Sequence, residues 1–326
     1  MPARTATPAS VLTGTHFRTV ARRDVIRFGG DDHRFVALRA HRLLRQGTLS
    51  LAELASPDLA PDPEVTAVIP ARNEAATVAS VVRECLHYAG RVLVVEGGSD
   101  DGTAEIAALA GAEVIRDQGL GKGAALRHAV AHVATPYCVF VDADGSHDPI
   151  DIPLLVAPLK AGRADHVGGS RLLGGSDELH GGLDEFLRLA GSAFITCVIN
   201  RRFGARLSDS QNGFRALRTE VFRALPLRSR HTTIEMEMIM ATLAAGYRLA
   251  EVPTHERPRA AGFSKISLAR PGTWFSYGWC LLRGLCARRT APRDAAAADA
   301  AADAASSPHR PAPREFSAPS ALSVER

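Results

Sequence analysis

The sequence contains few cysteines and few lysines, and it lacks any long uninterrupted apolar stretch. Its five cysteines form no CxxC pair and no Cys/His ligand pattern. This argues against a structural zinc site and favours reduced cysteines in the core of a cytosolic protein. The N-terminus has no apolar run typical of a signal peptide. No window reaches about 18 uninterrupted apolar residues, so we expect no membrane-spanning helix.

Lysine is scarce although the chain is basic. Only Lys122, Lys160 and Lys265 are lysines among the 39 Lys and Arg residues, so each is a candidate for a specific role. The net charge of +4 is modest and does not indicate a nucleic-acid partner. A length of 326 residues with 46% apolar and 23% charged residues is typical of a globular protein with one large domain or two small ones.

The two ends of the chain differ from its middle. The first 46 residues hold nine arginines against three aspartates, and three prolines follow between residues 56 and 64. We interpret residues 1–62 as an Arg-rich arm and linker, either a solvated appendage or a segment that binds anionic lipid or a partner. Residues 290–326 are rich in Ala, Pro and Ser with few large apolar residues, which predicts a disordered tail. The folded domain is therefore expected over residues 63–289.

Apolar strand patterns alternate with helical patterns in this middle part. The expected strands are 65–71, 91–98, 113–117 and 137–145, and the expected helices are 73–89, 101–112 and 121–133. Such alternation predicts an α/β fold, a mostly parallel sheet with helices on both faces. Ligands bind beyond the carboxyl ends of the strands in such sheets. Three polar turns follow strands at that edge, at residues 70–74, 96–103 and 142–144.

The pair Asp142 and Asp144 ends the fourth expected strand. Side chains at i and i+2 of an extended segment point to the same side, so the two carboxylates repel each other unless a cation lies between them. The other interpretation is a solvated turn, since Gly145, Ser146 and Pro149 follow. The sequence alone leaves both open.

An apolar stretch from Trp274 to Arg289, WFSYGWCLLRGLCARR, is too short to span a membrane and is interrupted by Arg283. It fits a buried core helix, which we favour. It also fits a helix in a membrane interface with its aromatic residues inward.

Seven motifs occur in a fixed order: VIPARNEAATV, VVEGGSDDGT, GLGKGAAL, DADGSHDP, GGSR, DSQNGFRAL and HERPRAAGFSKI. Together they resemble family 2 glycosyltransferases of the Rossmann-like GT-A fold, nearest the polyprenyl-phosphate hexosyltransferases typified by dolichol-phosphate mannose synthase. The resemblance covers roughly residues 65–270. It implies a nucleotide-sugar donor, a UDP- or GDP-hexose, whose diphosphate must be neutralised as it departs.

The resemblance gives the acidic pair a role. Asp142 and Asp144 are expected to hold Mg²⁺ or Mn²⁺, hard cations that bind carboxylate oxygens and act on the leaving diphosphate as Lewis acids. The resembling enzymes often carry Gln where this chain has Ser146, so water can take the place of a third protein ligand.

The remaining donor-site residues follow from the first three motifs. Pro70 and Ala71 are expected to contact base and ribose through their backbone, with Asn73 and Glu74 nearby; Asn73 also fits a helix cap. Lys122, flanked by glycines at a helix start, is expected to bind donor phosphate, with a flexible surface turn as the alternative.

The second motif departs from the resembling enzymes. They usually show two acids where this chain has Glu96 and Gly97, and the missing second acid commonly reads the base. Glu96 is still expected to reach a ribose hydroxyl. Residues 99–103 also fit a helix cap.

Acceptor-site residues are expected in the second half. The resemblance implies that Arg171, Arg188 and Arg259 clamp the acceptor phosphate, which the planar guanidinium fork suits. Surface ion pairs are the alternative. Asp209 fits a base or an organiser of the site, and Asp144, Asp209, Arg259 and Lys265 form the expected catalytic set. At least one of Glu235 and Glu237, on an apolar helix, is expected to be buried and paired.

The expected function is metal-dependent, inverting transfer of a hexose to polyprenyl phosphate. The location expected for it is cytoplasmic, peripheral on the inner face of the membrane. The alternatives are transfer to a soluble hydroxyl acceptor (a glycan, glycerate or natural product), a sugar nucleotidyltransferase, or an inactive module that binds sugar nucleotides. The sequence does not indicate which sugar, which base or which oligomeric state applies.

Overall fold

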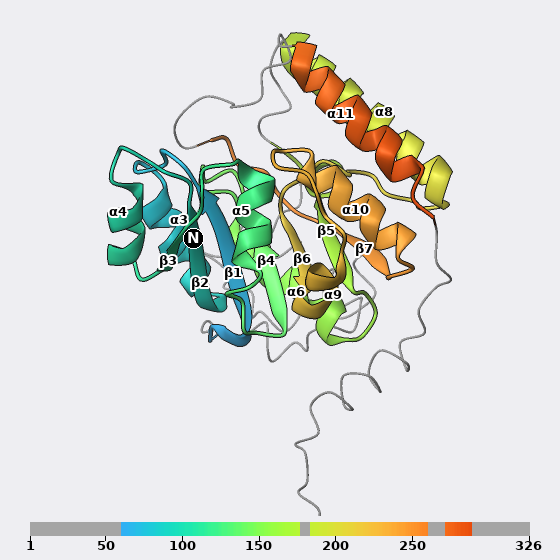
Figure 1. The fold of residues 1–326 in the computed structure, drawn as a ribbon. Coiled ribbons are helices and arrows are strands. Elements are labelled where there is room, and N and C mark those ends of the chain that lie inside the picture. The colour runs from blue at the N-terminus through green and yellow to red at the C-terminus, as the bar shows by residue number, and fades with distance from the viewer. Residues whose placement is uncertain (1–59, 177–182, 260–270, 289–326) are drawn as a thin grey trace, which may run out of the picture.

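The computed structural model describes residues 60–176, 183–259 and 271–288 (Figure 1). The Arg-rich arm before residue 60, the predicted tail, and Ser264 and Lys265 lie outside these residues. Within them, no helix is both long enough and apolar enough to span a membrane.

A seven-stranded sheet forms the centre of the protein, with the order β3-β2-β1-β4-β6-β5-β7. Its strands are β1 (Asp62–Ala71), β2 (Ala89–Glu96), β3 (Glu113–Arg116), β4 (Tyr137–Phe140), β5 (His166–Ser170), β6 (Arg215–Arg218) and β7 (Leu249–Pro253). All neighbouring strands pair in parallel except β6, which is antiparallel to both β4 and β5. The predicted α/β fold with a mostly parallel sheet is confirmed.

Helices cover both faces of the sheet. One apolar core lies between the sheet and α3 (Val78–Leu86), α4 (Thr103–Leu109) and α6 (Ile152–Lys160). A second lies between the sheet and α5 (Lys122–Ala129), α9 (Thr219–Ala224) and α10 (Ile234–Ala244). Successive strand residues point to opposite faces, so Ile69 lies in the first core and Val68 in the second. A short 3-10 helix, η4 (Pro149–Asp151), precedes α6, and the one-turn α7 (Arg171–Gly174) follows β5.

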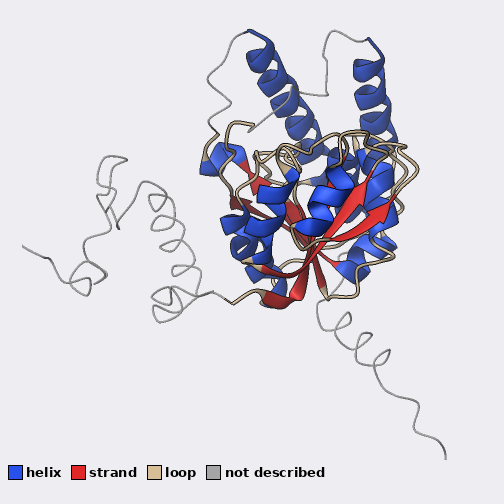
Figure 2. Cartoon of the chain, turned by 90° about the vertical axis from the view of Figure 1, so that its left-hand side faces the viewer, coloured by secondary structure: helices blue, strands red, loops and turns tan. Residues whose placement is uncertain are grey.

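Two further helices, α8 (Leu183–Phe203) and α11 (Pro271–Leu285), project from one side of the body (Figure 1), and their projecting parts stand apart (Figure 2). Their C-terminal parts pack on α10 through a third apolar cluster that includes Ile199, Met236 and Cys280. Arg202 joins them, because its guanidinium donates to the carbonyl oxygens of Leu285 at 2.8 Å and Ala287 at 3.1 Å.

The interpretation of residues 274–289 as a core helix is wrong. Between Gly272 and Leu285 of α11 only Cys280 is buried, whereas Trp274, Phe275 and Trp279 are 53%, 73% and 58% exposed. A stretch of apolar residues predicted burial, but α11 contacts the body along one side only. The expectation that most cysteines lie in the core holds for Cys85, Cys138 and Cys280 and fails for Cys197 and Cys286, which are exposed.

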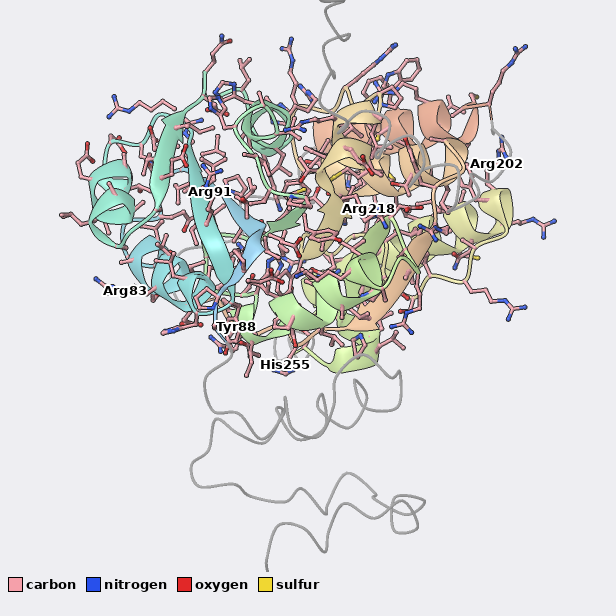
Figure 3. All side chains as sticks on the ribbon, turned by 90° about the horizontal axis from the view of Figure 1, so that it is seen from below. Arg83, Tyr88, Arg91, Arg202, Arg218 and His255 are labelled. Atoms are coloured by element: carbon pink, nitrogen blue, oxygen red, sulfur yellow. The ribbon has the colours of Figure 1, made fainter. Side chains whose placement is uncertain are left out.

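The two opposite ends of the strands carry different groups of residues. Figure 3 shows the molecule from below, with Arg91 at the start of β2 and Arg218 at the end of the antiparallel β6. Arg91 pairs with Glu113 at 2.5 Å and Arg218 with Asp165 at 3.7 Å. The opposite edge, where the parallel strands end, carries the predicted polar turns.

Candidate active site

A cavity of about 930 Å³ opens at the carboxyl ends of the strands and continues between α8 and α11. It brings together most of the residues that the sequence predicted as a site: Pro70, Ala71, Glu74, Lys122, Asp142, Asp144, Arg171, Arg188, Asp209 and Arg259. Two predicted residues, Asn73 and Glu96, do not line it.

Lys122 lies between two carboxylates near the middle of the cavity. Its ammonium nitrogen is 2.6 Å from Oδ1 of Asp142 and 2.7 Å from Oε1 of Glu235. Burial alone would lower the pKa of Lys122, but attraction to Asp142 and Glu235 raises it above its ordinary value, so the lysine is charged. Burial would raise the pKa of Asp142, and attraction to Lys122 and then His147 holds it well below its ordinary value. The surface-turn interpretation of Lys122 is therefore wrong.

His147, which the sequence did not point to, supports Asp142 from the other side. The backbone N–H of Asp142 donates to Nδ1 of His147 at 3.0 Å, and the imidazole stacks on Phe214 with the ring centres 4.8 Å apart. Burial lowers the pKa of His147 against the attraction of Asp142 and Asp144. A Cβ atom on Gly213 would lie 2.9 Å from the Lys122 ammonium and 3.1 Å from Oδ2 of Asp142, so only glycine leaves this contact undisturbed.

Asp144 is held by its own turn and by one arginine. Its Oδ1 accepts from the hydroxyl of Ser146 at 2.7 Å and from its backbone N–H at 3.1 Å. Its Oδ2 lies 3.1 Å from the guanidinium of Arg259. Asp142 and Asp144 are thus not a plain solvated turn, because both line the cavity and each is paired with a cationic side chain.

Two carboxylates facing one cavity fit a divalent ion, because Mg²⁺ and Mn²⁺ prefer oxygen ligands. The described residues contain no group of three or more His, Cys, Asp or Glu that could hold a metal ion by themselves. An ion at this place would take its remaining ligands from a diphosphate and from water, as expected where Ser146 replaces Gln. Lys122 and Arg259 now neutralise the two carboxylates and would have to yield to it.

Asn73 and Glu96 have structural roles next to the cavity. Asn73 has a left-handed backbone with φ of 54°, and α3 begins only at Val78, so Asn73 does not cap that helix. Its side-chain oxygen instead accepts from the Asp100 N–H at 3.2 Å, which joins the first two polar turns. Glu96 is 3% exposed; its Oε1 accepts from the Ser99 N–H, and it lines a smaller separate cavity of about 180 Å³.

The segment of residues 99–103 leads into α4, whose first residue is Thr103. The N-cap residue is Gly102 and provides no side-chain cap, but Asp101 before it accepts from the Thr103 N–H at 3.1 Å. The segment also contacts the first polar turn, because the Glu74 N–H donates to the hydroxyl of Thr103 at 2.9 Å. These contacts fix the loop that carries Glu74.

Arg171 and Asp209 form a two-point ion pair on the side of the cavity nearest α8. Arg171 donates to both oxygens of Asp209, at 2.7 Å and 3.1 Å, and lies 3.3 Å from Oε1 of Glu256. Burial would raise the pKa of Asp209, but Arg171 holds it below its ordinary value. Arg188 of α8 also lines the cavity.

Both glutamates expected on the apolar helix are buried and paired, on α10. Glu235 binds Lys122 at 2.7 Å, and Glu237 accepts from the Ser229 N–H at 2.7 Å and pairs with Arg283 of α11. This prediction is confirmed.

Sequence reasoning missed several cavity residues besides His147: Arg72, Asp117, Glu256, Trp274 and Tyr277. Arg72 and Asp117 directly follow the ends of β1 and β3, a position that could have identified them.

Known proteins resemble this chain over the same region. The model of the family "Glycosyl transferase family 2" matches residues 66–225. The glycosyltransferase AglJ of Haloferax volcanii is 35% identical over 209 residues, which is 62% of this chain and 66%, just under two thirds, of AglJ. An uncharacterised glycosyltransferase of Mycobacterium bovis is 32% identical over 203 residues, covering 62% of this chain and 89% of its own length.

A solved structure shares the fold. Glucosyl-3-phosphoglycerate synthase of Mycobacterium tuberculosis, in complex with Mn²⁺, UDP-glucose and phosphoglyceric acid, superposes with a TM-score of 0.54 at 23% identity. The match covers 68% of this chain and 79% of that protein, and at this identity it shows the fold alone.

Proposed function

The chain belongs to glycosyl transferase family 2, a family of glycosyltransferases, and we propose that it transfers a hexose from a nucleoside diphosphate to a polyprenyl phosphate. One observation carries the proposal. A single cavity holds the acidic pair and Lys122 together with Arg171, Arg188 and Arg259, and its rim on α8 and α11 is apolar and aromatic. The acidic pair and the lysine suit a sugar nucleotide. The arginines, of which Arg259 lies 3.1 Å from Asp144, suit an acceptor phosphate beside the donor, and the rim suits a lipid.

Asp142 and Asp144 hold a divalent ion, Mg²⁺ or Mn²⁺, in this proposal, and the ion supplies Lewis-acid stabilisation of the departing diphosphate. Lys122 adds a second positive charge at a helix N-terminus, where phosphate is favoured. Pro70, Ala71 and Glu74 line the neighbouring part of the cavity, where base and ribose would lie.

Reaction proceeds by direct displacement. An oxygen of the acceptor phosphate bonds to the anomeric carbon while the bond from that carbon to the diphosphate breaks, and the nucleoside diphosphate leaves with the electron pair. A cavity of about 930 Å³ admits donor and acceptor together, which a single displacement requires. One displacement inverts the configuration of the anomeric carbon.

The acceptor side favours a nucleophile that is already ionised. Asp209, the candidate base, is ion-paired on both oxygens, and Arg171 lowers its pKa, which weakens it as a base. A phosphate needs no proton removed, whereas a sugar hydroxyl does. Asp209 therefore acts in this proposal as the organiser that orients Arg171, while Arg171, Arg188 and Arg259 bind the acceptor phosphate. The proposed catalytic part of Lys265 concerns a residue outside the described ranges.

The apolar rim supports a lipid as the carrier of that phosphate. Phe194 of α8 and Trp274 of α11 line the cavity and are also exposed, so apolar surface continues from the cavity to the outside. Phe275, Trp279 and Leu282 extend it along α11. Exposed aromatic residues with neighbouring arginines suit a membrane interface, and we propose peripheral attachment to the cytoplasmic face of a membrane, with the polyprenyl chain leaving between α8 and α11.

The test is incubation of the protein with radiolabelled UDP- or GDP-hexose, Mg²⁺ or Mn²⁺, and vesicles that contain polyprenyl phosphate. Label is expected in the organic phase, and EDTA or Asp142→Asn with Asp144→Asn should remove it. A parallel reaction offers phosphoglycerate, a phosphate acceptor without a lipid. Label that enters only the phosphoglycerate product would refute the lipid acceptor, and full transfer in EDTA would refute the metal.

A further inference from the structure

The second polar turn, residues 96–103, places no acidic residue in the large cavity that could bind the base of the donor. Resembling enzymes place an acid where this chain has Gly97. The neighbouring Glu96 is buried, accepts from the Ser99 N–H and lies 3.9 Å from Arg116; it lines only the smaller cavity, whereas Asp117 lines both cavities. We infer that Asp117, which follows the adjacent strand β3, replaces the missing acid and reads the base. This inference rests on the proposed sugar-nucleotide donor and adds the residue that recognises its base.

Backbone pairing brings three strand ends into a row. The Gly97 N–H donates to the Ala71 carbonyl at 2.9 Å, and the Asp117 N–H donates to the Glu96 carbonyl at 2.9 Å. Ala71, Gly97 and Asp117 therefore lie side by side where β1, β2 and β3 end, and all three line the large cavity.

The carboxylate of Asp117 lies beside the place that a residue 97 side chain would occupy. A Cβ atom on Gly97 would be 3.5 Å from Oδ1 of Asp117, an ordinary contact distance. A side chain at residue 97 would therefore occupy the region in which the Asp117 carboxylate lies. An acidic side chain can reach this region from the end of β2 or from the end of β3.

The loop after β3 fixes this carboxylate. Oδ1 of Asp117 accepts from the Gly119 N–H at 2.7 Å. Gly119 has a φ of 67°, and a Cβ atom on it would lie 3.0 Å from the Gly97 carbonyl oxygen, so the loop is pressed onto the end of β2. Among the described residues Asp117 makes no other side-chain hydrogen bond or ion pair, so its second oxygen remains for a ligand.

A carboxylate only accepts hydrogen bonds, which defines the class of base it selects. Uracil and guanine present a ring N–H at the centre of their pairing edge, whereas cytosine and adenine present a lone pair there and donate only from the amino group beside it. In this inference Asp117 faces the ring position, so it favours uracil or guanine nucleotides. Guanine offers an additional amino group beside its ring N–H, so separate uracil and guanine arms of the experiment identify which base is used.

The test measures the affinity of the full-length protein for UDP, GDP, CDP and ADP with Mn²⁺ by calorimetry. The wild type should bind UDP or GDP about tenfold or more tighter than CDP and ADP, because a hydrogen bond to a charged group is gained. Asp117→Asn should remove most of this preference. Asp100→Asn, the same change at an exposed acid that does not line the cavity, is the matched control and should retain it.

Two further arms keep the test decisive. Gly97→Asp combined with Asp117→Asn returns an acid from the neighbouring strand and should restore the preference. If Asp117→Asn fails to fold, the wild type still reports: the N3-methyl form of UDP, or the N1-methyl form of GDP, should bind about tenfold or more weakly.

The outcomes separate the inference from the function on which it rests. Tight binding of UDP or GDP with preference unchanged in Asp117→Asn, or unaffected by methylation of the base, overturns the role of Asp117 alone. No binding of any nucleoside diphosphate overturns the sugar-nucleotide donor as well.

Discussion

The ammonium group of Lys122 lies 2.7 Å from Oε1 of Glu235, so the first residue of α5 is ion-paired with the buried helix α10. The same nitrogen is 2.6 Å from Asp142, at the end of the strand that carries the acidic pair. Glu235 thereby holds Lys122 at the middle of the cavity in the protein without substrate. Oε2 of Glu235 is buried and has no hydrogen-bond partner among the described residues, so the ion pair with Lys122 is the main compensation that they provide for burying this charge.

Lys122→Met is expected to lower kcat/KM for the nucleotide sugar by about 100-fold, comparable with loss of one preorganised donor to a developing charge. The positive charge near the departing diphosphate disappears while the side chain keeps most of its length. Initial rates of label transfer at varied donor concentration measure the effect. Lys160→Met is the matched control, because Lys160 pairs with Asp62 and Glu64 away from the cavity. Equal rates for both variants would remove Lys122 from donor binding.

Arg171→Lys is expected to raise the KM for polyprenyl phosphate by about tenfold or more and to change the KM of the donor little. Lysine cannot donate in two parallel directions to Asp209 and also face Glu256. Transfer rates at varied acceptor concentration measure the change.

Arg248→Lys provides the comparison for Arg171. Arg248 makes a similar two-point pair with Asp165, at 3.0 Å and 2.7 Å, but does not line the cavity. This control should lower stability and leave the acceptor KM unchanged. If both variants raise the acceptor KM alike, Arg171 acts through general stability rather than through the acceptor phosphate.

Some of the site could be predicted because it depends on local pattern. Asp142 and Asp144 follow an apolar strand, and parallel strands end at one edge, so their place beside Pro70 and Ala71 follows from the alternation of elements. The contact of Lys122 with Glu235 could not be predicted in this way. It depends on how α10 docks on the sheet, which a helix pattern does not specify.

The wrong prediction for α11 and the missed residues His147 and Asp117 also depend on contacts between elements that are distant in the sequence. Apolar residues of α11 predicted burial, but the composition of a helix does not say whether a second element covers it. His147 lies in a segment of turn-forming residues, and such residues form turns with or without tertiary contacts. Its stacking on Phe214 therefore could not be recognised in the sequence. Asp117 follows β3 and belongs to none of the seven motifs; its place beside Gly97 depends on the pairing of β2 with β3, which no single motif specifies.

Stability is expected to fall as the pH drops below about 6.5, in part because of His166. This histidine is buried, and its Nδ1 lies 2.9 Å from the Thr242 hydroxyl. Its Nε2 has no hydrogen-bond partner in the part of the chain that the structure describes. Burial, with a smaller contribution from Arg215, lowers its pKa well below 6.5. The unfolded state therefore binds the proton first, and stability present above the unfolded pKa is lost as pH falls towards the folded pKa.

His166 contributes up to about 1.4 kcal/mol per pH unit in this window. Urea unfolding at several pH values between 7.5 and 5 measures the slope. His166→Gln should make the slope less steep, while the buried His147 keeps part of it. An identical slope in the variant would show that His166 does not titrate between the folded and unfolded states in this range.

Replacing Trp274, Phe275 and Trp279 together by serine is expected to weaken binding to anionic vesicles by about tenfold or more, because the variant loses apolar area available for burial in the interface. All three side chains are more than half exposed, so the change leaves the core intact. Vesicle sedimentation measures binding. Transfer to a short-chain, water-soluble prenyl phosphate should fall less than transfer to polyprenyl phosphate in vesicles, since the short acceptor does not require the membrane and loses only the contact with Trp274 in the cavity rim. Leu109→Ser is the matched control, because Leu109 is 87% exposed on α4, far from α11 in the fold (Figure 1). If the triple variant binds vesicles normally but changes from dimer to monomer in gel filtration, the aromatic surface of α11 is a contact between copies of the chain, and the lipid acceptor loses its main structural support.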